Sequence, residues 1–141
     1  MSSSIPASAA TVATELDLVA AVGSVDDPTT WDQAIGAAHD LGGLDVTYLN
    51  ASAYGFTELI DELPIDELPN DLYRRTIGTN IGGVVLGVRA VVPALQARGG
   101  GAIVATASVA GIVVFAPNPL YTLTEQAVTG FVQALAPDLL A

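Results

Sequence analysis

Polar residues that follow apolar runs are the first candidates for chemistry in this sequence. Ser24 follows the first run, residues 50–52 (Asn-Ala-Ser) follow the second, and Ser108 follows the third. Ser108 lies in Thr-Ala-Ser-Val-Ala rather than in a Gly-x-Ser-x-Gly elbow, which argues against a hydrolase nucleophile. His39 has no acid and serine around it in a catalytic pattern, so we expect an imidazole that is solvated or paired with the helix dipole. The chain has no cysteine, which excludes disulfides and thiolate metal sites.

The acidic segment between residues 58 and 71 is a second candidate. Its acids are not spaced as a calcium-binding loop requires, so a solvated surface is expected. The segment contains Ile-Asp-Glu-Leu-Pro twice, at residues 60–64 and 65–69, which we interpret as a duplication in a surface loop. The sequence therefore predicts no metal site.

The polar candidates lie at the ends of three predicted strands. Residues 18–22, 45–49 and 102–107 are short apolar runs, and each precedes one of the polar positions. Apolar residues spaced three and four apart predict helices over residues 28–41, 70–98 and 119–139. Glycines at 42–43 and 99–101 follow the first two helices and are expected to cap them.

This alternation of strands and helices predicts a three-layer α/β fold. The strands are almost wholly apolar, which favours a parallel sheet buried between helices on both faces. Ligands of such sheets bind outside the carboxyl ends of the strands. The polar residues after the three strands therefore mark the expected site.

Composition limits the partners of the 141-residue chain. Apolar residues make up 51% and charged residues 13%, which excludes a disordered chain. The net charge is −11 and the four cations are all arginines, so we expect neither nucleic acid nor a membrane as a partner. No uninterrupted apolar run reaches the roughly 18 residues of a membrane span, and the N-terminus lacks a secretory pattern. We expect a cytoplasmic protein with a disordered tail over residues 1–10 and one domain over residues 11–141.

Four motifs resemble the central part of the short-chain dehydrogenase/reductase family. They are Asp-Val-Thr-Tyr-Leu-Asn-Ala-Ser at 45–52, Thr-Asn-Ile-Gly-Gly at 79–83, Gly-Ala-Ile-Val-Ala-Thr-Ala-Ser at 101–108 and Tyr-Thr-Leu-Thr-Glu at 121–125. They occur in the family's order, and the interval between Ser108 and Tyr121 agrees with the family's pattern. The resemblance covers residues 18–140 and implies a truncated Rossmann-like βαβαβα core.

The resemblance implies hydride transfer between NAD or NADP and a small-molecule alcohol or carbonyl. The family uses an Asn–Ser–Tyr–Lys tetrad, which would place Asn80, Ser108 and Tyr121 in the first three roles. Tyr121 would donate a proton to the substrate oxygen, Ser108 would hold that oxygen, and Asn80 would bind a water in a locally disturbed helix. Glu125 stands where the family has lysine, and its negative charge opposes the phenolate that a lysine favours.

The resemblance also implies cofactor contacts at Ser24, Asn50 and Ala51. Ser24 replaces the family's usual acid, and the Asn-Asn-Ala-Gly turn of the family appears here as Leu-Asn-Ala-Ser at 49–52. The glycine-rich phosphate turn and the C-terminal substrate lobe of the family are expected to lie outside this chain. The alternative function is therefore a catalytically inactive fragment or pseudoenzyme that acts as a self-association or interaction module.

Each catalytic candidate also has a structural interpretation that the sequence leaves open. Asn80 could be a polar residue satisfied by neighbouring backbone groups. Ser108 could be a turn former, and Tyr121 could pack its ring near the start of a helix.

Glycines recur along the predicted helix 70–98, at residues 78, 82, 83 and 87. Such a stripe of small residues lets a neighbouring helix approach closely, although each glycine costs about 1 kcal/mol of helix propensity. The resemblance implies a dimer contact made by helices 70–98 and 119–139. We therefore expect a homo-oligomer with a self-association surface near these residues: Val85, Val88, Val92, Phe131 and Leu135.

Overall fold

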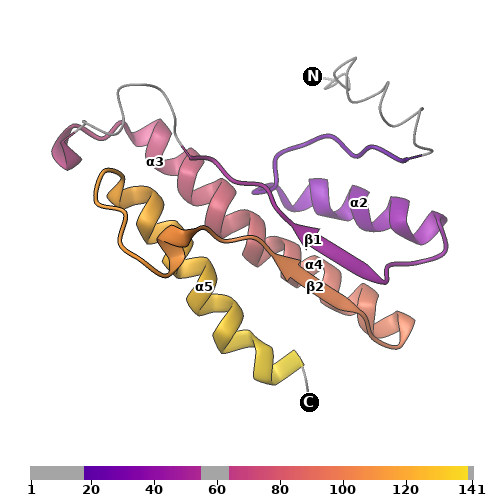
Figure 1. Ribbon diagram of the computed structural model, residues 1–141. Helices are drawn as coiled ribbons and strands as arrows, with labels where there is room; N and C mark the ends of the chain where they lie inside the picture. The colour runs from indigo at the N-terminus through magenta and orange to yellow at the C-terminus, as the bar shows by residue number, and fades with distance from the viewer. Residues whose placement is uncertain (1–17, 55–63, 140–141) are drawn as a thin grey trace.

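The structure is a computed structural model, and it describes residues 18–54 and 64–139. The expected tail over residues 1–10 and the first copy of the repeated acidic motif, except Pro64, lie outside the described residues. The described elements are, in chain order, α2 (Pro28–Asp40), β1 (Val46–Leu49), a 3-10 turn (Ile65–Glu67), α3 (Asn70–Ile77), a π-helical segment (Gly78–Gly82), α4 (Gly83–Arg98), β2 (Ala102–Ala105), a second 3-10 turn (Val109–Gly111) and α5 (Pro119–Leu139). In Figure 1, α3, the π-helical segment and α4 run on as one long helix, with α2 and α5 on either side of it.

The three predicted helices are confirmed, because local chemistry fixes their ends. The carboxylate of Asp27 accepts a hydrogen bond from the N–H of Thr29 at 2.9 Å and so caps α2, and Pro28 occupies the first helical position. After α4, Gly99 adopts a φ of 94°, a left-handed conformation that glycine reaches without strain.

The sheet is a parallel pair, so the expected α/β class with parallel strands is confirmed. Val46 of β1 is opposite Ala102 of β2, and Leu49 is opposite Ala105. Side chains alternate along β1, since Val46 and Tyr48 are exposed whereas Leu49 is buried. This alternation shows that one face of the pair meets the core and the other meets solvent.

All three long helices pack on the same face of the sheet. The core on that face draws residues from α2, β1, β2, α4 and α5: Trp31, Leu49, Val84, Val88, Val92, Ile103, Ala105, Val128, Phe131 and Leu135. The other face carries Val46, Tyr48 and Val104, which are exposed. The sequence predicts helices on both faces of the sheet, whereas the described helices cover only one. An apolar strand indicates that both faces are buried, but it does not say which segment covers each face.

The predicted strand over residues 18–22 is not formed, and that expectation was wrong. In the part of the chain that the structure describes, the sheet consists of β1 and β2 alone. Leu18 and Val19 are more than half exposed, at 55% and 58%. A strand requires a neighbour that pairs with its backbone groups, and an apolar run without such a neighbour among the described residues stays irregular.

The glycine stripe of the long helix is covered by this chain itself. A Cβ atom at Gly83 would lie 2.7 Å from Cγ2 of Val25, in the loop before α2. A Cβ atom at Gly87 would lie 2.7 Å from Cδ2 of Leu49 and 2.9 Å from the ring of Trp31. The stripe therefore does allow close approach, but α2, the loop before it and β1 make that approach.

The residues expected on a self-association surface do not share one environment. Val88 is 7% exposed and lies in the core, so the expectation is wrong for it: α4 turns this side chain towards the sheet. Val92, Phe131 and Leu135 are half-buried and pack against the same core. Val85 is 38% exposed.

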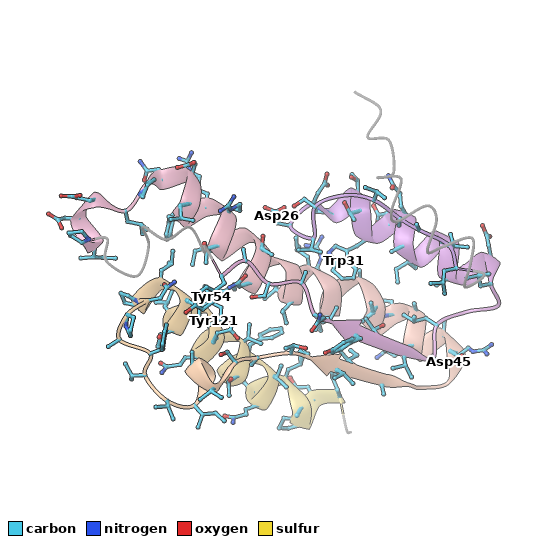
Figure 2. The ribbon with its side chains drawn as sticks, turned by 45° about the horizontal axis from the view of Figure 1, so that its top comes forward. Asp26, Trp31, Asp45, Tyr54 and Tyr121 are labelled. Atoms are coloured by element: carbon cyan, nitrogen blue, oxygen red, sulfur yellow. The ribbon has the colours of Figure 1, made fainter. Side chains whose placement is uncertain are left out.

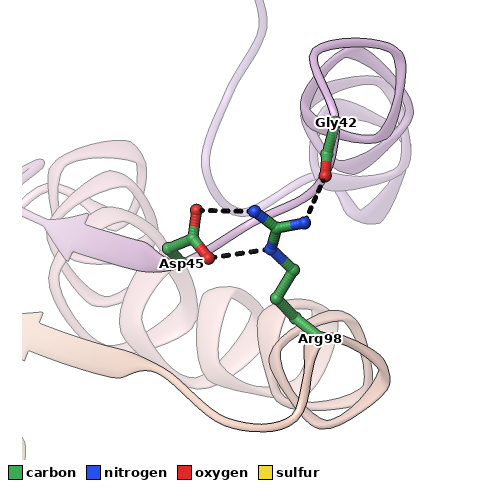
Figure 3. A network of polar contacts seen from close by, with 3 residues as sticks. All are labelled: Gly42, Asp45 and Arg98. Atoms are coloured by element: carbon green, nitrogen blue, oxygen red, sulfur yellow. Dashed lines mark hydrogen bonds and ion pairs between the residues drawn. The ribbon is translucent and has the colours of Figure 1, made fainter.

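Arg98 ties the end of α4 to the two segments beside it (Figure 3). Its Nε donates to Oδ1 of Asp45 at 2.8 Å, and its Nη1 donates to the carbonyl oxygen of Gly42 at 2.8 Å. The hydrogen bond from the Arg98 guanidinium, followed by its charge, lowers the pKa of Asp45 below the ordinary value of 3.8. One side chain thereby joins the end of α2, the start of β1 and the end of α4.

The stretch Asn70–Arg98 is long and apolar enough to cross a membrane, by length and composition alone. It passes this test although polar residues interrupt its apolar runs. A single helix of this kind is weak support for a membrane span, because core helices of soluble proteins pass the same test.

Candidate active site

Asn80 lies in the π-helical segment and is 2% exposed. Its Nδ2 donates to the carbonyl oxygen of Ala53 at 3.1 Å and to Oγ1 of Thr124 at 2.9 Å. Its Oδ1 accepts a hydrogen bond from the N–H of Ala53 at 2.6 Å. Widened π-helical turns are frequent at functional sites. Through this one amide, the long helix is joined to the loop after β1 on one side and to α5 on the other.

Ser108 precedes the 3-10 turn that follows β2. Its Oγ accepts a hydrogen bond from the N–H of Ala110 at 3.2 Å, and its own N–H donates to Oε2 of Glu125 at 2.7 Å. Glu125 is 4% exposed, and neither ion pair within residues 18–54 and 64–139 involves it. The carboxylate that stands in place of the lysine is therefore bound to the turn that carries Ser108.

Tyr121 lies in the first turn of α5 and is half-buried. Its ring meets the ring of Tyr54 edge-on, with 4.3 Å between the centroids, and Figure 2 shows the two side by side. Its N–H donates to Oδ1 of Asn118 at 2.9 Å, and Nδ2 of Asn118 donates to the carbonyl oxygen of Tyr54 at 3.2 Å. Ring packing and backbone contacts together hold Tyr121 against the loop after β1.

Two adjacent residues of α5 bind two of the catalytic candidates, and the third candidate, Tyr121, belongs to the same helix. Thr124 accepts the hydrogen bond from Asn80, and Glu125 accepts the one from Ser108. Tyr121 lies three and four positions earlier, on the same face of the helix. Each candidate also makes the structural contact that its residue type allows, namely backbone pairing for Asn80, turn capping for Ser108 and ring packing for Tyr121.

The residues that hold these candidates in place were not identified from the sequence. Asn118 could have been found, because an asparagine before a proline is a typical start of a helix. Ala53 lies 27 positions from Asn80, and no local pattern reports a contact over that distance. Tyr54 and Thr124 are likewise defined as site residues only by their tertiary contacts.

Asn50 and Ala51 lie at the carboxyl end of β1, as expected. Together with Trp31 of α2 they line a cavity of about 90 Å³. Oδ1 of Asn50 accepts a hydrogen bond from Oγ1 of Thr106 at 2.7 Å, which joins the ends of the two strands. The cavity thus lies between the carboxyl end of β1 and α2.

Ser24 lies apart from the catalytic candidates, in the loop before α2. Its hydroxyl donates to Oδ1 of Asp26, and it is exposed. Its neighbour Val25, rather than Ser24 itself, lines the cavity.

The cavity beside Asn50 and Ala51 is too small for a whole dinucleotide. Ligand pockets usually measure about 300–1,000 Å³, whereas the cavity beside Asn50 measures about 90 Å³. A pyrophosphate needs free N–H groups at a helix start, but α2 begins with the carboxylate of Asp27 and with Pro28. No group of three or more His, Asp or Glu side chains that could hold a metal occurs in the described ranges.

Comparisons with known sequences point to one family. A family model described as short chain dehydrogenase matches residues 3–141. Trans-4-hydroxycyclohexanecarboxylate dehydrogenase of Sinomonas cyclohexanicum is 35% identical over 116 residues, which are 82% of this chain and 42% of that protein. Cyclohexanol dehydrogenase of Acinetobacter sp. (strain SE19) is 35% identical over 100 residues, which are 71% of this chain and 38% of that protein.

A solved structure agrees with this result. The 3-ketoacyl-ACP reductase from Sinorhizobium meliloti 1021 matches with a TM-score of 0.81 and 32% identity, over 92% of this chain and 52% of that chain. This chain therefore spans about half, or less, of the length of the relatives that it matches.

Proposed function

Because the chain belongs to the short-chain dehydrogenase family, we propose that it forms the oxygen-binding part of an NAD(P)-dependent oxidoreductase site. The proposed substrates are small-molecule alcohols or carbonyl compounds. Two relatives are named for the dehydrogenation of ring alcohols, which supports a cyclic secondary alcohol as the first substrate to test. The proposed catalytic residues are Ser108 and Tyr121, together with Asn80, whose π-helical backbone would bind a water of the proton relay.

The arrangement around the first turns of α5 carries this proposal. Asn80 reaches Thr124 at 2.9 Å, and the N–H of Ser108 reaches Glu125 at 2.7 Å. These contacts attach the side chain of Asn80 and the backbone of Ser108 to the helix that carries Tyr121. An amide, an aliphatic hydroxyl and a phenol are groups that would bind and protonate a substrate oxygen.

The chemistry follows from the charge that develops on the substrate. A carbonyl that is being reduced gains negative charge on its oxygen, which hydrogen-bond donors stabilise and a proton neutralises. The hydroxyl of Ser108 would hold that oxygen, and the phenol of Tyr121 would give it the proton. Asn80 would keep the loop after β1 and α5 in place around them. A bound nicotinamide would supply or accept the hydride.

The cofactor contacts stay a proposal that rests on the resemblance alone. Ser24, Asn50 and Ala51 would contact NAD or NADP at the edge of the sheet. The last two border a cavity that is too small for a dinucleotide, so binding there needs more room than the described residues enclose.

Trp31 offers a direct test of cofactor binding, because it is the chain's only tryptophan and lines the cavity. Titration with NADH or NADPH should quench its fluorescence and should saturate below millimolar cofactor. Unchanged emission at millimolar concentrations of both would reject the proposal.

A second test isolates the phenol. Tyr121→Phe keeps a ring against Tyr54 but removes the hydroxyl, so oxidation of cyclohexanol should fall by about 100-fold or more while cofactor affinity is kept. Tyr73→Phe, at an exposed position of α3, is the matched control and should leave both unchanged. Equal rates for the two variants would remove Tyr121 from the mechanism.

An interaction module remains the second candidate function, and the bare face of the sheet favours it. Tyr48 and Val46 are 63% and 61% exposed there, and Val85 is exposed on the long helix. Self-association through this face of the sheet, or through helices 70–98 and 119–139 as the resemblance implies, would show as a dimer in sedimentation velocity at tens of micromolar. A strict monomer would contradict the module.

The cytoplasmic location stays a prediction from composition.

A further inference from the structure

Glu125 is a buried acid whose carboxylate faces the backbone of another segment. It is 4% exposed, and Oε2 accepts the N–H of Ser108 at 2.7 Å. Burying a carboxylate is costly unless it receives hydrogen bonds, so this contact is needed by the acid as well as by the turn.

The turn after β2 is bound to Glu125 at its start and packs closely against α5 at its end. The side chain of Glu125 binds the first N–H of the turn, at Ser108. A Cβ atom at Gly111, where the turn ends, would lie only 2.9 Å from the carbonyl oxygen of Glu125. The turn can pack this closely because residue 111 is glycine.

The hydrogen bonds within the turn do not use the N–H of Ser108, which is therefore available to a partner outside the turn. The carbonyl oxygen of Ser108 accepts from the N–H of Gly111 at 2.9 Å, and its Oγ accepts from the N–H of Ala110 at 3.2 Å. These two bonds fix the shape of the turn but not its place relative to α5. The bond to Glu125 ties the start of the turn, and with it Ser108, to the helix that carries Tyr121.

We propose that Glu125 is a positioning residue, which holds Ser108 against α5 by accepting its backbone N–H. The inference rests on the proposed function for the role of Ser108, but the contact itself does not. It also predicts that Glu125→Lys is no simple repair of the family motif. A lysine carries donors and no acceptor, so it would leave the N–H of Ser108 without its partner.

Amide hydrogen exchange, followed by NMR on the full chain, tests the contact. Exchange at Ser108 should accelerate about tenfold or more in Glu125→Ala and in Glu125→Lys, because a hydrogen bond to a charged acceptor is lost. Glu125→Gln keeps an acceptor oxygen and should retain most of the protection. Gln126→Ala, at the exposed neighbouring position of α5, is the control and should leave Ser108 unchanged. Equal protection of Ser108 in wild type, Ala and Lys variants would overturn the inference.

A second readout covers the case in which the Ala and Lys variants do not fold. In Glu125→Gln the acceptor becomes neutral, so the amide proton of Ser108 should shift upfield while amides inside α4 keep their positions. No shift at Ser108 would equally overturn the inference.

The kinetic consequence separates positioning from a general loss of stability. Where alcohol oxidation is measured, Glu125→Gln should largely retain the wild-type rate, and Glu125→Ala should lower kcat with little change in KM for the cofactor. Loss of protection at Ser108 in a chain that binds no NADH would support the inference and reject the proposed function. Normal protection at Ser108 in a Glu125→Ala variant that still binds NADH would do the reverse.

Discussion

Replacing Asn80 with alanine should destabilise the fold by about 3 kcal/mol. The side chain is 2% exposed and makes hydrogen bonds at 2.6, 2.9 and 3.1 Å, to both backbone groups of Ala53 and to Thr124. Each such bond contributes about 1 kcal/mol net, and alanine makes none of them. Against a total stability of about 5–15 kcal/mol, this loss is large.

Urea denaturation followed by circular dichroism at 25 °C measures the effect. The midpoint should fall while the slope of the transition stays the same, since the surface exposed on unfolding hardly changes. Asn70→Ala makes the same substitution at an exposed position in the first turn of α3 and should change stability by less than about 0.5 kcal/mol.

A double-mutant cycle isolates the contact that joins the long helix to α5. Thr124→Val keeps the volume of a side chain that is fully buried but removes its hydroxyl. We expect a coupling energy of about 0.5–1.5 kcal/mol between Asn80→Ala and Thr124→Val. A loss below about 0.5 kcal/mol in Asn80→Ala, or a coupling of zero, would refute the reasoning.

Two further predictions concern the fold around the site. Gly87→Ala should lower stability by about 1 kcal/mol in urea, because a methyl group 2.7 Å from Leu49 overpacks the core by more than helix propensity regains. Gly36→Ala has open space around it and should instead add about 0.5–1 kcal/mol; equal effects at the two glycines would contradict the packing. Since Arg98 lowers the pKa of Asp45 in the folded state, the advantage of wild type over Asp45→Asn should be present at neutral pH and fade as the pH drops below 3.8. Thermal melts from pH 2 to 7 measure this difference, and a constant one would contradict the ion pair.

The helices could be predicted because their signals are local. Asp27 and Pro28 start α2, and Gly99 ends α4, through contacts or backbone conformations that involve only the nearest residues. The predicted helix over 119–139 coincides with α5, and the one over 70–98 coincides with α3, the π-helical segment and α4 together.

The strands and layers could be predicted only in part because they depend on neighbours. The runs at 45–49 and 102–107 each contain a strand, since each has the other as its partner. The run at 18–22 has similar residues but no partner among the described ones, and it is irregular. For the same reason, apolar character alone could not tell that Val88 faces the core while Val85 is exposed.

The sequence by itself determined the residue types of the candidate site and the family to which the chain belongs. Asn80, Ser108 and Tyr121 were identifiable by motif order and spacing, and Glu125 by its departure from the motif. These properties are readable in one dimension because they depend on which residues occur and how far apart they are.

Only the tertiary structure decided what these side chains contact. Asn80 reaches Ala53 and Thr124, and Glu125 reaches Ser108, across 17 to 44 positions of chain. The physical reason is that a hydrogen bond depends on distance and direction in space, which packing of the long helix against α5 sets and local sequence does not. In the sequence, Glu125 is noticed only because it replaces the family's lysine. In the fold, its carboxylate accepts the backbone N–H of Ser108.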